Sequence, residues 1–480
     1  MRHHYVLPDI SKPGKIGCSL PALDVPASDL PSKDALRQDL ALPQVSEVEL
    51  IRYFTDLSRL NYGLDTGFYP LGSCTMKYNP KLHEDVAVLS GFTSVHPYQP
   101  DKSVQGALQL MFELQGLLTE ITGMNMTSLS PMGGAQGELA NILMLKAYFR
   151  DKKDLKRKRI LVPDTAHGTN PATAAMCGFE ITAVPSDADG NLDLEKLKSM
   201  LNDEVIAITL TMPTTLGLFD PHIEEINQLV HKCGALLCGD GANLNSLIGK
   251  VKFGDMGFDC VQLNLHKTFS TPHGGGGPGS GPVCVKEHLA DFLPSPIVAK
   301  QGDAYTFMTP SKSVGRLGSA YGNFGVIVKA YAYILSLGAA GMKQVSENAV
   351  INANYIKEKL KDSYYLPYDR TCMHEVIFAE KWQKAVGIST MDVAKRLLDY
   401  GFHPPTVYFP LVVEGALMIE PTETESKETL DAFIEAMKTI AKEAKENPDI
   451  LHSAPHNTPV KRLDEVAAAR KPDLRWKMTK

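Results

Sequence analysis

Short apolar runs of β-type composition recur between residues 61 and 330, and helical stretches separate them. Strands that alternate with helices along a chain are typical of a mostly parallel sheet with helices on both faces. The pattern therefore predicts an α/β fold whose large domain spans residues 61–330. The expected strands are residues 160–163, 205–211, 235–239, 260–265 and 281–285.

The two ends of the chain differ from this central part. Residues 1–60 are rich in proline and polar residues as far as Pro43 and then turn helical from 46 to 60, which predicts an arm that packs on a partner chain. Residues 331–480 predict a smaller α+β domain. Its expected helices are 344–360, 390–400 and 426–446, the last near a serine N-cap, and its expected strands include 374–378 and 416–419.

One lysine, Lys267, stands at the end of an apolar run and just before a long glycine-rich turn. A lysine that attacks a carbonyl must spend time as the neutral amine, so it has to be partly desolvated or placed near another cation. We expect His266 and the tight loop behind it to supply both conditions. A solvated lysine at a strand end is the ordinary alternative.

An aspartate, Asp240, ends the preceding apolar strand and is followed by small residues. Enzymes that use pyridoxal phosphate need such a pair, because the lysine holds the cofactor as a Schiff base while a carboxylate keeps the pyridine nitrogen protonated. Asp240 and Lys267 are both expected at the carboxyl edge of the parallel sheet, where open α/β folds bind their ligands.

Two further segments fit the same kind of site. Gly134-Ala-Gln-Gly-Glu138 leads into a helix, and glycines ahead of a helix let backbone N–H groups approach a phosphate at the positive end of the helix dipole. His167 follows the strand at 160–163, and a histidine in such a turn can stack on a pyridine ring and move protons. A common glycine turn and a surface histidine are the alternatives.

Composition agrees with a large soluble enzyme. The chain has 480 residues with 44% hydrophobic content, enough for two or three domains at roughly one per 150 residues. The net charge of −6 argues against a general nucleic-acid binder.

The closest cysteine pair, Cys233 and Cys238, lacks zinc-site spacing, so we expect reduced thiols and no metal. The N-terminus has no apolar core of signal-peptide length, and the apolar window at 324–342 contains Lys329 and predicts a buried helix rather than a membrane span.

Longer motifs resemble the P-protein of the glycine cleavage system, in its two-subunit bacterial or archaeal form, where the matching chain is subunit 2. The resemblance covers the chain from about residue 60 to the C-terminus. Two segments, Met132-Gly133 and residues 211–217, depart from the pattern expected of that family. The motifs are Asp65-Thr-Gly-Phe-Tyr-Pro-Leu-Gly-Ser-Cys-Thr-Met-Lys-Tyr-Asn-Pro80, the Gly134–Glu138 loop, Ala166-His-Gly-Thr-Asn-Pro171, Asn264-Leu-His-Lys-Thr-Phe269, Gly322-Asn-Phe-Gly325, Pro421-Thr-Glu-Thr-Glu425 and Ala454-Pro-His-Asn-Thr-Pro459.

The resemblance implies a fold-type I pyridoxal-phosphate enzyme that decarboxylates glycine and transfers the aminomethyl group to the oxidised lipoyl arm of H protein. It implies a cytoplasmic α2β2 assembly with subunit 1, and no membrane or nucleic-acid partner. The implied catalytic residues are Lys267, Asp240 and His167. The further implied cofactor contacts are His266, Gly134, Ala135, Gln136, Ala242 and Thr214.

Two other interpretations stay open at this point. The lysine, the aspartate and the glycine loop alone also fit a cysteine desulfurase, an aminotransferase or another amino acid decarboxylase of the same fold. A noncatalytic scaffold subunit is the second alternative, and Lys267 and Asp240 argue against it. Arg316 is a weak candidate for the substrate carboxylate, because a tight arginine clamp would stabilise the charge that decarboxylation must remove.

Overall fold

The computed structural model describes residues 6–475 except 27, 38–39, 41, 275–276, 278 and 319. The chain separates into two compact units, one made of Met1–Gly63 with Pro459–Lys480 and the other of Leu64–Thr458. The first unit contains α1 (Glu47–Ser58) and α14 (Glu465–Arg470), with the short 3-10 helices η1 (Leu7–Ile10) and η2 (Lys33–Ala35). Helix α1 was expected to start at residue 46, and Ser46 is its N-cap. The side chains of Ser46 and Glu49 each accept from the other residue's backbone N–H.

A seven-stranded sheet forms the centre of the second unit, with the strand order β1-β7-β6-β5-β4-β2-β3. Every neighbouring pair from β6 to β3 is parallel, and β7 runs antiparallel to both of its neighbours. The predicted mostly parallel α/β fold is therefore confirmed. The strands are β1 (Met126–Ser128), β2 (Arg159–Pro163), β3 (Glu180–Val184), β4 (Val205–Thr211), β5 (Leu236–Gly241), β6 (Cys260–Leu263) and β7 (Val283–Val285).

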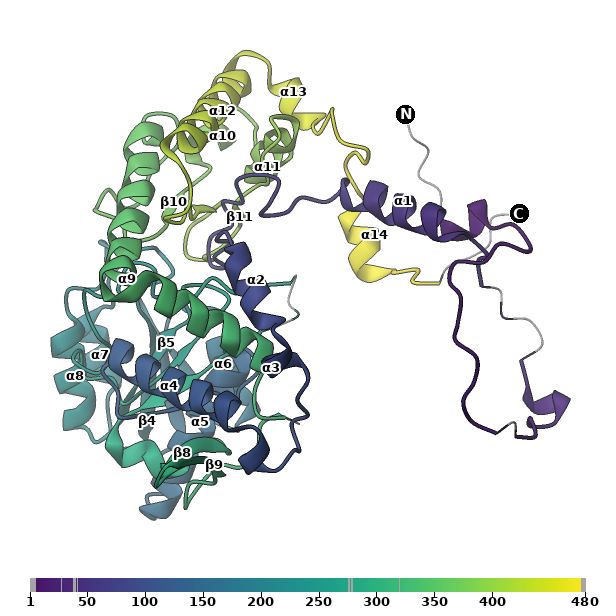
Figure 1. Ribbon diagram of the computed structural model, residues 1–480. Helices are drawn as coiled ribbons and strands as arrows, with labels where there is room; N and C mark the ends of the chain where they lie inside the picture. Colours follow the sequence, from purple (N-terminus) through teal and green to yellow (C-terminus); the bar gives the residue numbers. More distant parts are fainter. Residues whose placement is uncertain are drawn as a thin grey trace. The chain divides into compact units, whose positions relative to one another are not determined.

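Both faces of this sheet are buried, because successive side chains of a strand point to opposite faces. In β5, Leu237 packs into one hydrophobic core while Leu236 and Cys238 pack into another. The helices around the sheet (Figure 1) are α2 (Lys81–Ala87), α3 (Ser90–Thr93), α4 (Gln105–Thr122), α5 (Gly134–Asp151), α6 (Thr169–Met176), α7 (Leu194–Met200), α8 (Ile223–Lys232) and the 3-10 helices η3 (Asp101–Ser103) and η4 (Glu287–Phe292). A two-stranded ribbon, β8 (Ile297–Gln301) with β9 (Ala304–Met308), lies beside α4.

One long helix, α9 (Phe324–Leu360), joins two cores, because its first half packs with the large sheet and its last turns pack with a second, smaller sheet. The helical stretches expected at 324–342 and 344–360 are parts of this one element, which bends at Gly338, where φ is +59°. In the described part of the chain only α9 is long and apolar enough to cross a membrane, a test that core helices also pass.

The smaller sheet has the strand order β10-β12-β11 and is antiparallel. Its strands are β10 (Val376–Phe378), β11 (Thr406–Val407) and β12 (Leu417–Ile419), and its helices are α10 (Lys381–Lys384), α11 (Thr390–Asp399), α12 (Lys427–Glu446) and α13 (Pro448–His452). The predicted helices at 390–400 and 426–446 are thus present, with Ser389 and Ser426 as N-caps. The predicted boundary between two domains at about residue 330 stays a prediction.

Candidate active site

The carboxyl ends of the parallel strands meet at one edge of the large sheet and carry most of the predicted site residues. His167 follows β2, Thr214 follows β4, Asp240 lies near the end of β5, and Lys267 follows β6. Together they line a cavity of about 310 Å³. The same cavity is lined by Gly134, Ala135, Ala242 and His266, whereas Gln136 does not line it.

Asp240 occupies the centre of this edge, and its two neighbours in the sheet both donate to its carboxylate. Thr211 of β4 and Gln262 of β6 stand in register with Asp240. The Thr211 hydroxyl lies 3.2 Å from Oδ2 and the Gln262 amide lies 2.5 Å from Oδ1. Asn170 donates to Oδ2 at 3.2 Å, and the backbone N–H of Ala242 donates to Oδ1 at 3.1 Å. These four donors favour a charged carboxylate at a position that is only 3% exposed.

Lys267 is 8% exposed, and its amine donates to the backbone carbonyl of Ser73 at 2.6 Å. The neighbouring His266 does not act as a second cation. Burial, with the charge of Lys267 and the nearby His273 as further causes, lowers the pKa of His266 to about 3. Lys267 is therefore buried, as the sequence predicted. His266, which was expected to be a positively charged neighbour, is instead a neutral ring.

The second wall of the cavity comes from the smaller sheet, and the sequence did not predict it. Val376 of β10 pairs with Ile419 of β12. Glu375 and Glu420 each stand one residue beyond this pair at the same end of the sheet, and His374 adjoins them. Glu375 accepts from the backbone N–H of Ser73 at 3.0 Å, so Ser73 links this wall to Lys267.

These buried groups favour their neutral forms. Burial, with the charge of Lys267 as a second cause, lowers the pKa of His374 to about 3. Burial also raises the pKa of both Glu375 and Glu420; the charge of Glu420 adds to the rise for Glu375, whereas hydrogen bonds oppose the rise for Glu420. Glu420 receives hydrogen bonds from Thr75 at 2.7 and 2.8 Å, from Asn243 at 2.9 Å and from Asn245 at 3.2 Å.

A further residue that was not predicted, Glu138, lies on α5 just behind the glycine loop. It is 8% exposed and lines the cavity. Its Oε1 lies 2.8 Å from the Thr169 hydroxyl, which lies 2.9 Å from Nδ1 of His167. Burial, with the charge of Asp240 as a second cause, raises the pKa of Glu138 to about 8. Burial lowers the pKa of His167, while Asp240 opposes that change.

Two predicted candidates lie away from the cavity. The Gln136 amide donates to the carbonyl of Leu317 at 2.6 Å and accepts from the N–H of Met132 at 2.6 Å, so it ties the glycine loop to a neighbouring loop. The guanidinium of Arg316 lies over the ring of Tyr321 at 5.1 Å. All eight cysteines are free in the structure.

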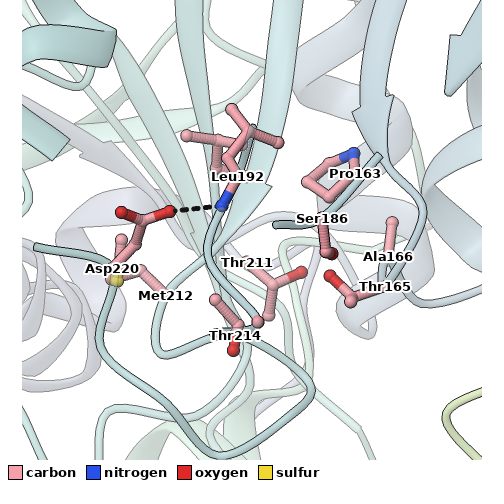
Figure 2. A pocket seen from close by; sticks show the side chains of 11 residues that line it. Pro163, Thr165, Ala166, Ser186, Leu192, Thr211, Met212, Thr214 and Asp220 are labelled. Carbon is pink, nitrogen blue, oxygen red and sulfur yellow. Dashed lines mark hydrogen bonds between the residues drawn. The ribbon is translucent and has the colours of Figure 1, made fainter. Parts of the chain in front are cut away.

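A smaller cavity of about 20 Å³ lies behind the wall that carries Thr211 and Thr214 (Figure 2). Asp220, which lines this smaller cavity, accepts from the backbone N–H of Leu192 at 2.9 Å, as the dashed line in Figure 2 shows. A volume of this size holds about one water molecule. Of these two cavities, the larger is the one suited to a cofactor.

The residues of the larger cavity fit pyridoxal phosphate. Its volume lies at the lower end of the range of small-molecule sites, about 300–1,000 Å³. Gly134 is the first residue of α5, where a Cβ would lie 2.3 Å from Oδ1 of Asn264, so a larger residue would require the Asn264 side chain to move. Two buried atoms in the wall, Nδ1 of His266 and Oδ1 of Asn264, have no hydrogen-bond partner in the described structure and are suited to a polar ligand.

Solved structures share this fold. The crystal structure of a glycine decarboxylase (P-protein) of the glycine cleavage system, in inhibitor-bound form, matches with a TM-score of 0.72 at 20% identity, over 85% of this chain and 93% of that one. Glutamate decarboxylase of Lactobacillus brevis matches with a TM-score of 0.68 at 15% identity, over 87% and 96%. Fold and site together define a fold-type I pyridoxal-phosphate-dependent enzyme.

Sequence comparison narrows this class. The family model "Glycine cleavage system P-protein" matches residues 21–307, and "Glycine dehydrogenase, C-terminal domain" matches residues 345–461. A probable glycine dehydrogenase (decarboxylating) subunit 2 from Caldanaerobacter subterraneus subsp. tengcongensis is 60% identical over 98% of both chains. Another from Thermotoga petrophila is 57% identical over 97% of this chain and 98% of that one. The chain belongs to the glycine cleavage system P-protein family, as its motifs predicted.

Proposed function

We propose that this chain catalyses the decarboxylation of glycine and transfers the remaining aminomethyl group to the oxidised lipoyl arm of H protein. One observation carries the proposal: Lys267 and Asp240 line the same cavity at the carboxyl edge of the sheet. The names of the relatives, glycine dehydrogenase (decarboxylating) subunit 2, supply the substrate.

Lys267 is the group that would hold the cofactor aldehyde, and Asp240 would contact the pyridine nitrogen. Gly134 and Ala135, at the N-terminus of α5, would receive the phosphate, with His266, Thr214 and Ala242 as further contacts. When bound, pyridoxal phosphate supplies an electron sink for the pair of electrons released from the bond between Cα and the carboxylate of glycine. The four donors to Asp240 hold its carboxylate in place and favour the charged form that this chemistry would use.

The remaining walls suit the loss of a carboxylate. Every residue that lines the cavity lies in the described part of the chain, and none is an arginine. His374 and Glu375 favour neutral forms there. A wall that does not pair with the substrate carboxylate does not stabilise the ground state that decarboxylation must leave. His167 would stack on the cofactor ring and move protons on the substrate side.

The proposal includes the partners and the compartment. The name of the relatives, subunit 2, implies a companion subunit 1. We propose an α2β2 assembly with that subunit in the cytoplasm, in which residues 1–60 pack on a partner chain. The net charge of −6 is consistent with the absence of nucleic-acid partners.

The test is the exchange of labelled bicarbonate into the carboxyl group of glycine, measured with the full chain, subunit 1 and lipoylated H protein. Exchange is expected in the wild type and is expected to be lost in Lys267→Ala, because no other residue is proposed to hold the cofactor aldehyde. Lys286→Ala is the matched control, because Lys286 also donates to a backbone carbonyl, that of Gly123, but lies outside the cavity.

Three results would decide against the proposal. Exchange at the wild-type rate in Lys267→Ala would remove the lysine from the mechanism. The visible absorbance of bound pyridoxal phosphate without any exchange would keep the class and move the substrate to another amino acid. Exchange at the full rate without subunit 1 would contradict the proposed assembly.

A further inference from the structure

A short segment of the chain, residues 71–75, connects the smaller sheet to Lys267. Leu71 forms an isolated antiparallel bridge with Ile419 of β12, so the segment is attached to the smaller sheet where it begins. Two residues further on, Ser73 lines the same cavity as Lys267. The segment therefore carries backbone groups from the smaller sheet to the edge of the large one.

The peptide group between Gly72 and Ser73 is held at both ends by residues of the smaller sheet or next to it. Its carbonyl, that of Gly72, accepts from the hydroxyl of Thr406 in β11 at 2.6 Å. Its N–H, that of Ser73, donates to Oε2 of Glu375, just before β10, at 3.0 Å. A planar peptide group that is bonded at both ends has a fixed orientation. The smaller sheet therefore sets the direction in which the chain enters Ser73.

Ser73 then turns the chain toward Lys267. Its φ is +64°, in the left-handed region that residues other than glycine seldom occupy. In this conformation the Ser73 carbonyl accepts from the Lys267 amine at 2.6 Å. Beyond the turn, the Thr75 hydroxyl lies 2.7 and 2.8 Å from the two carboxyl oxygens of Glu420, so the segment is held on that side as well.

We propose that the Ser73 carbonyl is the resting site of the Lys267 amine whenever that amine is not bonded to the cofactor aldehyde, and that Glu375 and Thr406 position this carbonyl. The inference rests on the proposed role of Lys267 as the residue that holds the aldehyde. In the proposed reaction glycine displaces the amine, and the amine must later return. A fixed place inside the cavity keeps the amine within reach for that return. Glu375 and Thr406 are positioning residues, because they act through the backbone of Ser73.

The test is competitive acetylation of lysines by a trace of acetic anhydride at about pH 7, well below the ordinary pKa of a lysine. The full chain is used, assembled with subunit 1 and freed of pyridoxal phosphate, and mass spectrometry gives the relative rate for each lysine. Lys286 is the internal reference, because its amine also donates to a backbone carbonyl, that of Gly123 at 3.0 Å, but lies outside the cavity.

Ser73→Val is expected to raise the rate for Lys267 relative to Lys286, because a β-branched residue disfavours the left-handed conformation that directs the carbonyl. The expected rise is about fivefold, the fold-change that corresponds to losing one ordinary hydrogen bond. Ser73→Gly is the matched control, because glycine adopts this conformation freely and is expected to keep the wild-type rate.

Two variants of Glu375 provide a second route if Ser73→Val does not fold. Glu375→Leu removes the acceptor for the Ser73 N–H and is expected to raise the rate for Lys267. Glu375→Gln keeps an oxygen acceptor and is expected to keep the wild-type rate. Thr406→Val and Thr406→Ser form the same kind of pair at the other end of the peptide group. A glutamine variant that behaved like the leucine variant would show that Glu375 acts by its charge, and it would overturn the positioning role.

Equal rates for Lys267 in the wild type, Ser73→Val and Glu375→Leu would overturn the inference, because the Ser73 carbonyl would then not restrain the amine. The labelling needs neither glycine nor H protein, so its result is independent of bicarbonate exchange. Rates that differ as expected, without exchange in the wild type, would reject only the proposed substrate. Exchange in the wild type together with equal rates would reject only this inference.

Discussion

Asp240 and Glu138 are both buried at the same cavity, but their carboxyl groups differ in the number of hydrogen bonds they receive. Asp240 has four donors, two of them from the strands on either side of β5. Glu138 contacts one hydroxyl, and its other oxygen has no partner in the described structure. Because hydrogen bonds to a carboxylate offset the cost of burying its charge, donor number rather than burial separates the two.

The same contrast separates the two walls of the cavity. The edge of the large sheet presents Lys267 and a carboxylate supported as an anion, whereas the edge of the smaller sheet presents His374 and Glu375, which burial keeps neutral. A cofactor that must be held by an amine and a negative charge fits the first wall. A substrate that must lose its carboxylate fits the second.

For this comparison of carboxyl groups, the largest expected effect comes from removing the charge of Asp240. Asp240→Asn keeps the size of the side chain but cannot stabilise a protonated pyridine nitrogen. We expect bicarbonate exchange to fall by at least about 100-fold, the usual size of losing one preorganised electrostatic contact. Asp259→Asn is the control, because Asp259 is also buried but bonds to His231 outside the cavity. Equal losses in the two variants would show that the effect is structural.

A smaller effect is expected on the pH dependence of stability. Burial and Glu420 raise the pKa of Glu375 in the folded chain, so the folded state binds its proton more tightly than the unfolded state does. The stability that this proton supports is present below the ordinary pKa of a glutamate, falls as the pH rises toward the folded value, and changes no further above it. Glu375→Gln removes this loss, so the variant should gain stability relative to the wild type as the pH rises. Denaturant unfolding at several pH values measures the difference, and parallel pH profiles would contradict it.

Much of the sheet edge was predictable, because each strand and the reactive residue that follows it lie in one short stretch of the sequence. Observed strands β2 and β4 to β7 coincide with the predicted ones within a few residues, and helix α5 follows the glycine loop as expected. Lys267, Asp240 and His167 then follow from the rule that the carboxyl ends of parallel strands meet at one edge. Their roles toward the cofactor stay predictions.

The second wall could not be predicted in the same way. Glu375 and Glu420 come together only because β10 pairs with β12, two short strands far apart in the sequence. Glu138 was visible as part of the glycine motif, but its meaning depends on the proximity of Asp240 and Thr169, which packing decides. Gln136 was predicted to contact the cofactor, but its amide instead connects two loops beside the cavity.

The most direct test of the comparison is infrared absorption of protonated carboxyl groups in the full chain at about pH 6, where an exposed carboxyl group is ionised. We predict that Glu138→Gln loses a protonated-carboxyl signal relative to the wild type. Adding Asp240→Asn to Glu138→Gln should remove no further signal, because both oxygens of Asp240 already accept hydrogen bonds from two donors each. In the double variant, Asp240 cannot change the signal through Glu138, because Glu138 is absent. An unchanged signal in Glu138→Gln, or a further loss in the double variant, would contradict the account that donor number separates Asp240 from Glu138.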